Sequence, residues 1–336
     1  MRRAAPIESS SVRPSPRAAL AAALVALAGA GPALAGNGGF APVEPRSPNA
    51  VGITDTYYLI LALTAAVFVI VEGALIVFLV RFRSRGRSRS VEGPQIRGNT
   101  SLELAWTVVP VLILGAIFGF VFAKLPDIDS TPPAHAGDAL RVKVTARQFY
   151  WQFEYPGGQI SVDRLVVPVG RVVTLDLVSP DVVHSWWVPA LGGKIDAIPG
   201  KTTHTWFQTD RVGTYRIRCA ELCGIEHAHM TGWVEVVRNG AYGRFLGLHT
   251  GASESVGRET VAGVCAKCHG LAGEGDYGPR LAGNSLLLDR RGIATLLREG
   301  KGRMPAVGAS WGDEQMAATI ATLRRRFGPG GSAGGG

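Results

Sequence analysis

The sequence predicts a multi-domain membrane protein made of a two-helix transmembrane hairpin, a small antiparallel β-sandwich or barrel, and an all-α C-terminal domain. Three features predict this organisation. Two long apolar segments come first, short alternating strands with Gly and Pro turns follow over about 140–238, and Ala- and Leu-rich helical stretches around Gly-rich loops fill about 253–327. A chain of 336 residues has room for two or three domains of ordinary size.

The formal net charge of +9 is concentrated in two stretches, 1–35 and 81–97, each of which includes or adjoins an apolar segment. Arginines in such places are typical of the cytoplasmic side of a membrane. Charged residues make up only 18% of the chain and hydrophobic residues 46%, which disfavours a disordered chain. The charge pattern therefore indicates membrane topology and argues against nucleic acid as a partner.

Residues 1–35 have the features of a secretion signal peptide. Arginine-containing residues 1–17 precede an apolar run over 18–30, and Ala33-Leu34-Ala35 forms an A-x-A cleavage site. The apolar run is too short to span a bilayer comfortably. An uncleaved N-terminal anchor is the alternative. Residues 36–55 are then an N-terminal external segment, and export places the bulk of the chain outside the cytoplasm.

The hairpin is predicted over 56–125, with helices at about 56–80 and 104–123. Both apolar segments are long enough to cross a bilayer. The arginine-rich sequence RFRSRGRSRS between them is expected on the cytoplasmic side, so that both ends of the hairpin lie outside. Glu103 at a helix start favours the helix dipole. Glu72, inside an apolar run, is a functional candidate or faces a partner helix.

Residues 126–238 are predicted to form the β domain. The runs LRVKVTARQFYWQFEY and RLVVPVGRVVTLDLVS alternate apolar and polar residues and are separated by a turn at Pro156-Gly157-Gly158. Further strand-like runs follow, which favours a sandwich or barrel of short strands. Residues 239–252 are predicted to be a linker and 253–327 the helical domain. The Gly-rich tail 328–336 is expected to be disordered.

The motif Cys265-Ala266-Lys267-Cys268-His269 is the covalent attachment sequence of haem c. In such a motif two thiols add to the porphyrin and the adjoining histidine ligates the iron. A zinc half-site or a redox C-x-x-C is the alternative. Zinc needs a second ligand pair, and no Cys or His follows His269. A thioredoxin-like site needs a βαβ context, which the sequence lacks.

The haem iron needs a sixth ligand, and Met304 lies on a loop flanked by Gly and Pro. A thioether there raises the reduction potential, as suits electron transfer. Met316 is the alternative, but it lies in the helical stretch DEQMAATIATL, where a core methionine is expected. The segment resembles a class I cytochrome c domain. In that family a proline carbonyl accepts the N–H of the iron-ligating histidine, which implies Pro279 in Gly278-Pro279-Arg280-Leu281.

The other two cysteines lie in the motif CAELCGIEHAHM over 219–230. Two thiolates four residues apart can bridge a pair of soft metal ions, and the H-x-x-M that follows supplies one imidazole and one thioether. This ligand combination favours copper over zinc or iron. A second imidazole comes from a histidine on a loop after a strand, whereas His204 and His229 are expected to be ordinary polar residues. The predicted ligands are His184, Cys219, Cys223, His227 and Met230.

Four sequences, NTSLELAWTVVPVLIL, ARQFYWQFEY, DVVHSWWVPALGGKIDAIPG and CAELCGIEHAHM, resemble cytochrome c oxidase subunit II in this order. With a signal peptide in front and a haem c segment behind, nearly the whole chain is similar to the fused, caa-type form. The resemblance implies a cupredoxin-like β-barrel that bears the binuclear copper centre CuA. It adds the backbone carbonyl of Glu221 to the copper ligands and directs the Glu221 side chain to a magnesium ion at the subunit I interface. It also implies that Glu103 marks the mouth of a proton channel into subunit I.

One position departs from the family pattern. The aromatic cluster of the family usually begins with a tryptophan that receives electrons from soluble cytochrome c, whereas this chain has Phe149, followed by Tyr150 and Trp151. Phenylalanine can pack against a haem edge but lacks the indole N–H. We expect these three residues to lie on the electron path from the tethered haem, which replaces the diffusing donor.

The resemblance implies a subunit of a proton-translocating cytochrome c oxidase without catalytic residues for oxygen in this chain. Electrons enter at haem c, pass to CuA and continue to the haem and copper of subunit I. Expected partners are subunit I, subunit III, a donor such as cytochrome c, and membrane lipid. The expected location is the bacterial plasma membrane, with the copper and haem c domains on the periplasmic side.

Three other classes fit less well. A membrane-tethered copper chaperone also combines C-x-x-x-C with a distant histidine, but its fold needs helices between strands and its histidine lies downstream. A nitrous oxide reductase shares the copper motif but has a large catalytic domain and no hairpin. A two-haem electron shuttle would need a second C-x-x-C-H, and the sequence contains one.

Overall fold

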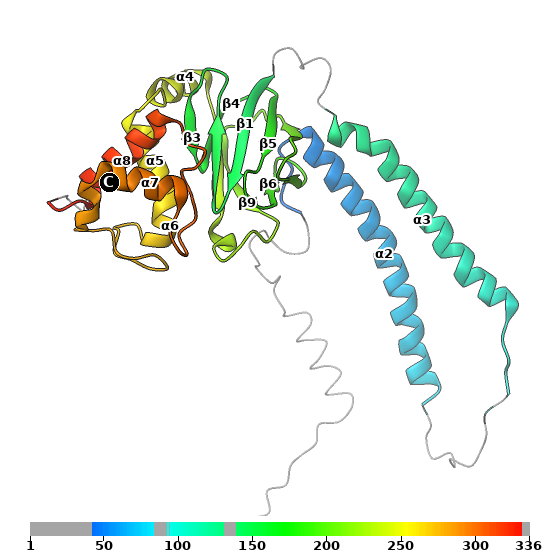
Figure 1. The fold of residues 1–336 in the computed structure, drawn as a ribbon. Coiled ribbons are helices and arrows are strands. Elements are labelled where there is room, and N and C mark those ends of the chain that lie inside the picture. Colours follow the sequence, from blue (N-terminus) through cyan, green and yellow to red (C-terminus); the bar gives the residue numbers. More distant parts are fainter. Residues whose placement is uncertain (1–41, 84–92, 94, 131–138, 331–336) are drawn as a thin grey trace, which may run out of the picture. The chain divides into compact units, whose positions relative to one another are not determined.

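The computed structural model describes residues 42–83, 93, 95–130 and 139–330 (Figure 1). The predicted signal peptide, most of the arginine-rich loop and the end of the Gly-rich tail lie outside the described residues. From Glu44 onward the chain forms one compact unit, which contains both the β domain and the helical domain.

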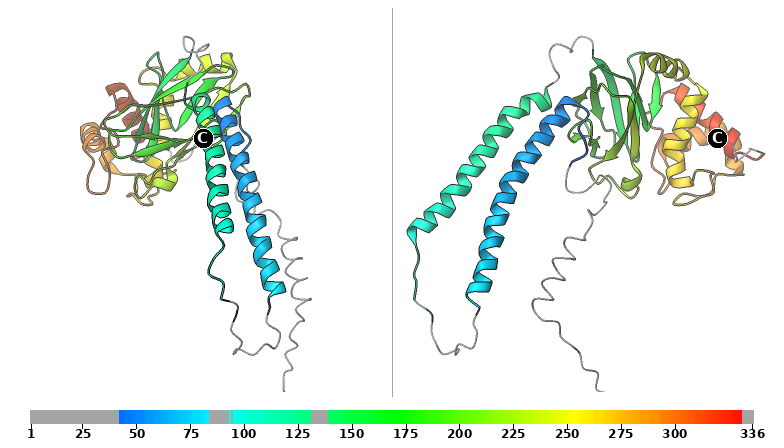
Figure 2. Two further views of the ribbon diagram at one scale, coloured as in Figure 1. Left: turned by 90° about the vertical axis from the view of Figure 1, so that its right-hand side faces the viewer. Right: turned by 180° about the vertical axis from the view of Figure 1, so that it is seen from behind.

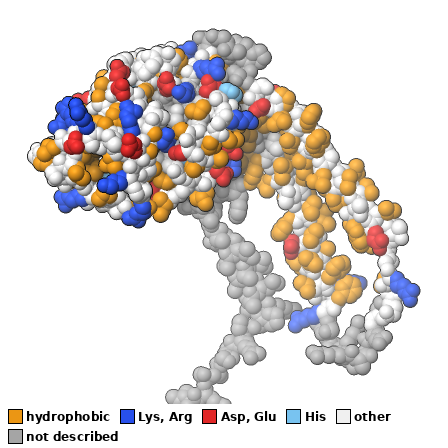
Figure 3. All heavy atoms as spheres, viewed as in Figure 1, with side chains coloured by type: hydrophobic (Ala, Val, Ile, Leu, Met, Phe, Trp, Pro, Cys, Tyr) orange, Lys and Arg blue, Asp and Glu red, His pale blue; other side chains and the backbone are white. Residues whose placement is uncertain are grey.

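The hairpin consists of α2, Pro48–Arg81, and α3, Thr100–Asp129. Both helices are long and apolar enough to cross a membrane, and hydrophobic side chains cover them in Figure 3. The two helices lie side by side (Figure 2). Nζ of Lys124 in α3 lies 3.6 Å from a carboxylate oxygen of Asp55 in α2. The prediction of two apolar helices is confirmed, although each helix is longer than predicted. No residue of α3 is buried within this chain, as expected of a helix that packs against lipid or another subunit.

The β domain is a sandwich of two five-stranded sheets (Figure 1). In the first sheet the order is β3, β2, β1, β5, β8, and in the second it is β4, β10, β9, β6, β7. The bounds of the first sheet are β1 Leu140–Arg147, β2 Tyr150–Glu154, β3 Ile160–Val162, β5 Val173–Val178 and β8 Thr203–Phe207. The bounds of the second sheet are β4 Arg164–Pro168, β6 His184–Trp187, β7 Ile195–Ala197, β9 Gly213–Cys219 and β10 Thr231–Val237.

The sheets are mixed, which differs from the predicted purely antiparallel arrangement. Strand β1 pairs with β5 in parallel, and β4 pairs with β10 in parallel. The chain crosses from the first sheet to the second at β4 and returns at β5, and such crossings bring strands back in the same direction. The predicted alternation holds within strands: β5 alternates buried and half-buried residues along its whole length.

The C-terminal domain is helical, as predicted. Its helices are α5 Glu254–Thr260, a π-helical turn at Val261–Cys265, α6 Ala266–His269, α7 Arg290–Glu299 and α8 Asp313–Phe327. Helices α5 and α8 are in close contact: a Cβ on Gly257 would clash with the carbonyl oxygen of Ala318. Met316 is buried in the core of this domain, in agreement with the expected core role.

The predicted linker contains helix α4, Asn239–Leu248. Its Phe245 is only 6% exposed and packs edge-on against the Tyr155 ring, with the ring centroids 5.5 Å apart. The Arg164 guanidinium lies 5.6 Å from the centre of the Phe245 ring. The connection between the two domains is therefore anchored on the β-sandwich and is not a free tether.

Candidate copper and haem sites

The six predicted copper ligands lie together at one end of the second sheet. His184 begins β6, Cys219 ends β9, and Trp186 pairs with Cys219 in the register of these strands. The loop 220–230 then turns back to β10, with Gly224 at φ +138°. The sulfurs of Cys219 and Cys223 are 3.9 Å apart. The contacts of the other ligands are Cys223 Sγ to His227 Nδ1 at 3.5 Å, Cys223 Sγ to Met230 Sδ at 3.7 Å, Cys219 Sγ to the Glu221 carbonyl at 3.3 Å, and Cys219 Sγ to His184 Nδ1 at 3.9 Å.

The donor set fits copper. Two sulfurs from cysteine, one thioether and two imidazoles converge, and soft sulfur ligands with imidazole select copper. The imidazole of His184 and the side chain of Met230 are fully buried, and Cys223 is 4% exposed. Burial in an apolar shell limits solvent access to a bound metal, which tunes its potential. Leu222 and Ile225 of the loop are exposed, and Ile225 also lines the cavity of the helical domain described below.

Asp181 orients the histidine. Its Oδ1 lies 2.9 Å from His184 Nε2, which leaves Nδ1 directed toward the cysteine sulfur. Burial lowers the pKa of His184, but the hydrogen bonds and charges of Asp181 and Cys219 together outweigh burial, and the pKa is raised overall. A carboxylate on the far nitrogen fixes the ring and its tautomer, as is usual for metal-binding histidines. Asp181 was not predicted from the sequence, although its position three residues before the histidine was a signal for it.

The two copper-loop thiols are in contact and shift each other's pKa in opposite directions. The hydrogen bond from Cys223 lowers the pKa of Cys219, and the same contact raises the pKa of Cys223. The loop therefore holds one thiolate near neutral pH. A thiolate is the form that binds metal, and the second proton leaves when the metal binds.

The predicted haem ligands line a cavity of about 1010 Å³ in the helical domain. Cys265, Cys268 and His269 line it from the attachment motif, and Met304 lines it from the loop after α7. His269 Nδ1 lies 2.6 Å from the carbonyl oxygen of Pro279, the contact implied by the cytochrome c resemblance. The volume is at the upper end of ordinary ligand pockets, and the lining is largely apolar, so the residues fit a haem.

The attachment thiols differ from the copper-loop thiols. Burial raises the pKa of Cys265 to about 12, and burial also raises the pKa of Cys268. Glu226 of the copper loop contributes to the second shift through its negative charge. Both attachment cysteines are therefore protonated thiols near neutral pH.

The aromatic segment 148–151 lies between the two sites. Phe149 and Gln148 line the haem cavity, and the Gln148 side chain donates to the Cys223 carbonyl oxygen at 2.6 Å. The Trp151 ring meets the His184 ring edge-on, with centroids 6.4 Å apart. Tyr150 is fully buried, and its hydroxyl donates to the carbonyl oxygen of Val307 in the helical domain. Gln148 is a second residue that the sequence analysis missed, although it adjoins the aromatic cluster.

Glu103 closes a cap at the start of α3. Its Oε1 lies 3.4 Å from the Asn99 N–H, and Asn99 in turn accepts from the Leu102 N–H at 3.2 Å. This is the dipole-favouring position expected from the sequence, and its role at a proton channel stays a prediction. Glu72 lies on the exposed surface of α2.

His229 pairs with Glu226 and His204 with Asp176, as expected of polar surface residues. The Glu221 side chain is exposed, and the one potential metal cluster found among the described residues contains no carboxylate. The magnesium site stays a prediction that needs oxygen ligands from another subunit.

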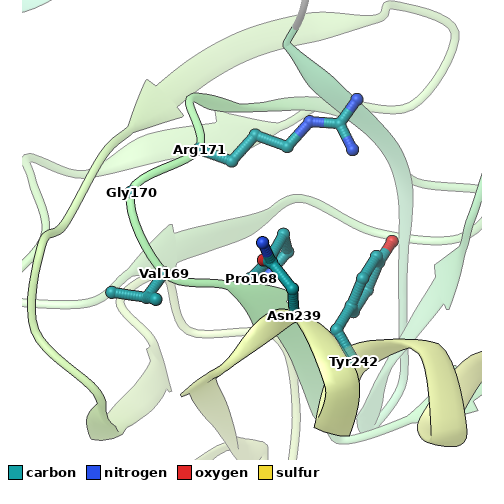
Figure 4. Close-up of a pocket in the computed structure, with 6 residues that line it drawn as sticks. All are labelled: Pro168, Val169, Gly170, Arg171, Asn239 and Tyr242. Carbon is teal, nitrogen blue, oxygen red and sulfur yellow. The ribbon is translucent and has the colours of Figure 1, made fainter.

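A second cavity of about 420 Å³ lies where the turn after β4 faces the start of α4 (Figure 4). Arg171 and Tyr242 point toward it from opposite sides, and none of the predicted ligands lines it. It therefore has no part in the copper and haem sites.

Three family models match the chain. Residues 39–123 match the transmembrane domain of cytochrome c oxidase subunit II, and residues 158–237 match its periplasmic domain. Residues 252–321 match a model described as cytochrome c oxidase, cbb3-type, subunit III. The three matches together cover the hairpin, most of the sandwich and most of the helical domain.

Curated relatives agree with these models. Subunit 2 of cytochrome c oxidase from Alkalihalophilus pseudofirmus is 35% identical over 251 residues, covering 69% of this chain and 71% of that protein. The subunit 2 from Cereibacter sphaeroides is 33% identical over 271 residues, covering 68% and 86%. The crystal structure of the periplasmic domain of subunit II from Bradyrhizobium japonicum is 32% identical, with a TM-score of 0.32, and covers 33% of this chain and 92% of that chain. This protein belongs to the cytochrome c oxidase subunit II family and carries a cytochrome c domain at its C-terminal end.

Proposed function

We propose that this subunit carries electrons from a covalently bound haem c in its C-terminal domain to a binuclear copper centre, CuA, and on to the oxygen-reducing site of subunit I. The process is part of aerobic respiration and is coupled to proton translocation. One observation carries the proposal: segment 148–151 contacts the haem cavity on one side and the copper loop on the other. When bound, the two groups supply the one-electron redox chemistry that amino acids lack.

The β-sandwich holds the copper ligands. His184, Cys219 and Met230 begin or end strands, or adjoin them, so the strand register sets their positions. Asp181 fixes the orientation of His184, and Gln148 fixes the carbonyl of Cys223. A rigid ligand frame reduces the rearrangement that accompanies electron transfer.

The helical domain holds the haem. Cys265 and Cys268 would supply the thiols for attachment, and His269 and Met304 would ligate the haem iron. The Pro279 carbonyl accepts the His269 Nδ1–H and keeps the ring oriented, which is how outer hydrogen bonds tune a metal-bound histidine.

The wider assignments follow the family. We propose residues 1–35 as signal peptide, 36–55 as external segment, 56–125 as hairpin, 126–238 as copper domain, 253–327 as cytochrome domain and 328–336 as tail. Glu221 binds magnesium at the interface with subunit I, and Glu103 lies at the mouth of a proton channel. The complex lies in the bacterial plasma membrane with subunits I and III, and cytochrome c or a similar protein reloads the fused haem.

Electron paramagnetic resonance of the full chain, loaded with copper and haem, tests the copper assignment. One unpaired electron shared by two equivalent coppers gives a multi-line hyperfine pattern, which we expect together with the near-infrared absorption of a mixed-valence pair. A four-line mononuclear spectrum from the fully loaded protein contradicts the proposal and favours copper delivery as the function.

A further inference from the structure

Lys267 lies inside the haem attachment motif, yet its ammonium group binds the β domain. Its Nζ donates to the backbone carbonyl of Phe149 at 2.8 Å and to Asp163 Oδ2 at 2.5 Å. Both charged side chains are 14% exposed. The residue between the two attachment cysteines therefore fixes the helical domain to the aromatic segment.

Asp163 is itself held by the aromatic segment. It lies between β3 and β4 with φ +56°, in the left-handed region that few non-glycine residues adopt. Its Oδ1 accepts the Trp151 N–H at 2.8 Å, and its own N–H donates to the Trp151 carbonyl at 2.8 Å. One carboxylate oxygen thus binds Trp151 and the other binds Lys267, so the pair links the copper domain directly to the attachment motif.

The two domains approach closely at this pair. A Cβ on Gly263, in the π-helical turn before the attachment motif, would lie 3.0 Å from Asp163 Oδ2 and 2.9 Å from a methyl carbon of Val162. Only a residue without a side chain fits at this distance. The close approach keeps water away from the ion pair and so strengthens it.

The loop that carries Met304 is held by the β1–β2 hairpin, which contains the aromatic segment. Arg147 donates to the Ala306 carbonyl at 2.7 Å, and the Tyr150 hydroxyl donates to the Val307 carbonyl at 2.7 Å. Trp311 donates to the same hydroxyl at 2.9 Å. Both segments that bear predicted iron ligands, the attachment motif and the loop that carries Met304, therefore contact the β1–β2 hairpin of the copper domain.

We propose that Lys267 and Asp163 are positioning residues that lock the fused cytochrome domain onto segment 147–151, so that the haem stays at the copper loop and does not swing on its connection. This inference rests on the proposed function, because the lock has its purpose in transfer from haem to copper. Breaking a buried ion pair leaves an uncompensated charge, which costs far more than the loss of an exposed pair.

Hydrogen exchange of the haem-loaded full chain measures how firmly the cytochrome domain is held on the copper domain, and this readout does not depend on activity. In Lys267→Met we expect the amides of residues 147–163 to exchange on the order of tenfold to a hundredfold faster than in the wild type, with other strands unchanged. Lys143→Met is the matched control, because Lys143 forms an exposed pair with Glu154 in the same domain. Lys267→Arg, which keeps the charge, is expected to restore most of the protection.

Two further variants keep the test independent of haem attachment. Asp163→Asn lies outside the attachment motif, and its asparagine suits the left-handed backbone. Gly263→Val wedges the two domains apart, whereas Gly247→Ala, at a helical position with nothing within 4 Å of its added Cβ, is the control. We expect Asp163→Asn and Lys267→Met to be non-additive, as for residues that act as one pair. If Lys267→Met, Asp163→Asn and Gly263→Val all keep the wild-type protection from hydrogen exchange, the proposal is overturned.

Electron injection into the haem of the assembled oxidase separates the two claims. If the lock exists, haem oxidation is independent of ionic strength in the wild type and becomes slower and salt-dependent in Lys267→Met. If the wild-type haem does not pass electrons to copper at all, the proposed function fails, whereas the exchange results still decide whether the lock exists. An unchanged rate and salt response in Lys267→Met, with wild-type transfer intact, overturns the lock.

Discussion

The copper loop and the haem cavity are built on different principles. The ends of β6 and β9 and the loop 220–230 bring the copper ligands together in the protein alone, with contacting donor atoms 3.3–3.9 Å apart. The haem ligands instead line the walls of a cavity of about 1010 Å³, on loops and short helices. The thiols of the two sites also differ: the pKa of Cys219 in the copper loop is lowered, whereas the pKa of Cys265 in the haem cavity is raised to about 12. The comparison indicates that the β-sandwich preforms its site, whereas the helical domain needs its ligand to complete its core.

Leaving out the haem tests this difference most strongly. In a Cys265→Ala/Cys268→Ala variant without haem, we expect the helical domain to lose its fixed structure while the sandwich stays folded. Without the haem, the largely apolar lining of the cavity faces water, which removes apolar burial that this small domain needs because domains are only marginally stable. Hydrogen exchange across both domains measures the effect. Slow exchange throughout residues 253–327 in the haem-free chain contradicts the comparison.

The reactivity of the copper-loop thiols tests the same difference between the copper site and the haem site. In the copper-free, haem-bearing chain we expect rapid alkylation of one cysteine, Cys219, because its pKa is lowered by the contact with Cys223. A lowered pKa keeps the thiolate present as the pH falls, so at pH 6 the thiolate fraction is on the order of a hundredfold above that of an ordinary thiol. Mass spectrometry locates the label. Equal labelling of both loop cysteines, or a rate that falls away below pH 8, contradicts the asymmetry.

Asp181→Asn probes how far the preformed site depends on its outer hydrogen bonds. The amide can still contact His184 but no longer carries the charge that orients the ring. Such changes lower metal affinity about 10- to 100-fold. Copper titration followed by the near-infrared band measures the loss, and Asp210→Asn on the surface is the control. Unchanged copper affinity indicates that strand register alone orients the ring.

Phe149→Ala gives the smallest expected effect. The ring lines the haem cavity beside Gln148, and its removal opens space without removing the Gln148 link to Cys223. We therefore expect slower transfer from haem to copper with unchanged copper content and fold. Transient absorption of the assembled oxidase measures the rate. An unchanged rate excludes the ring from the internal route and leaves Gln148 and Trp151 as its protein part.

Much of this organisation could be predicted from local sequence. The motif CAELCGIEHAHM predicted four side-chain ligands close together in sequence, and C-x-x-C-H predicted the haem attachment site, because both depend on neighbours in the chain. Partners that are distant in sequence were missed. Lys267 and Asp163 are 104 residues apart, and Gln148 and Cys223 are 75 apart. The parallel pairing of β1 with β5 was missed for the same reason, since alternation gives a strand but not its neighbour.

Time-resolved oxidation of the haem in the assembled oxidase tests the central claim, that this chain conducts electrons from its haem cavity to its copper loop. After a single electron is delivered to the haem, we predict that the haem is oxidised as the copper is reduced, without added soluble cytochrome c. In Cys223→Ser, which removes a copper ligand, the haem should stay reduced. A wild-type haem that stays reduced until soluble cytochrome c is added, or that is oxidised equally fast in Cys223→Ser, contradicts the account.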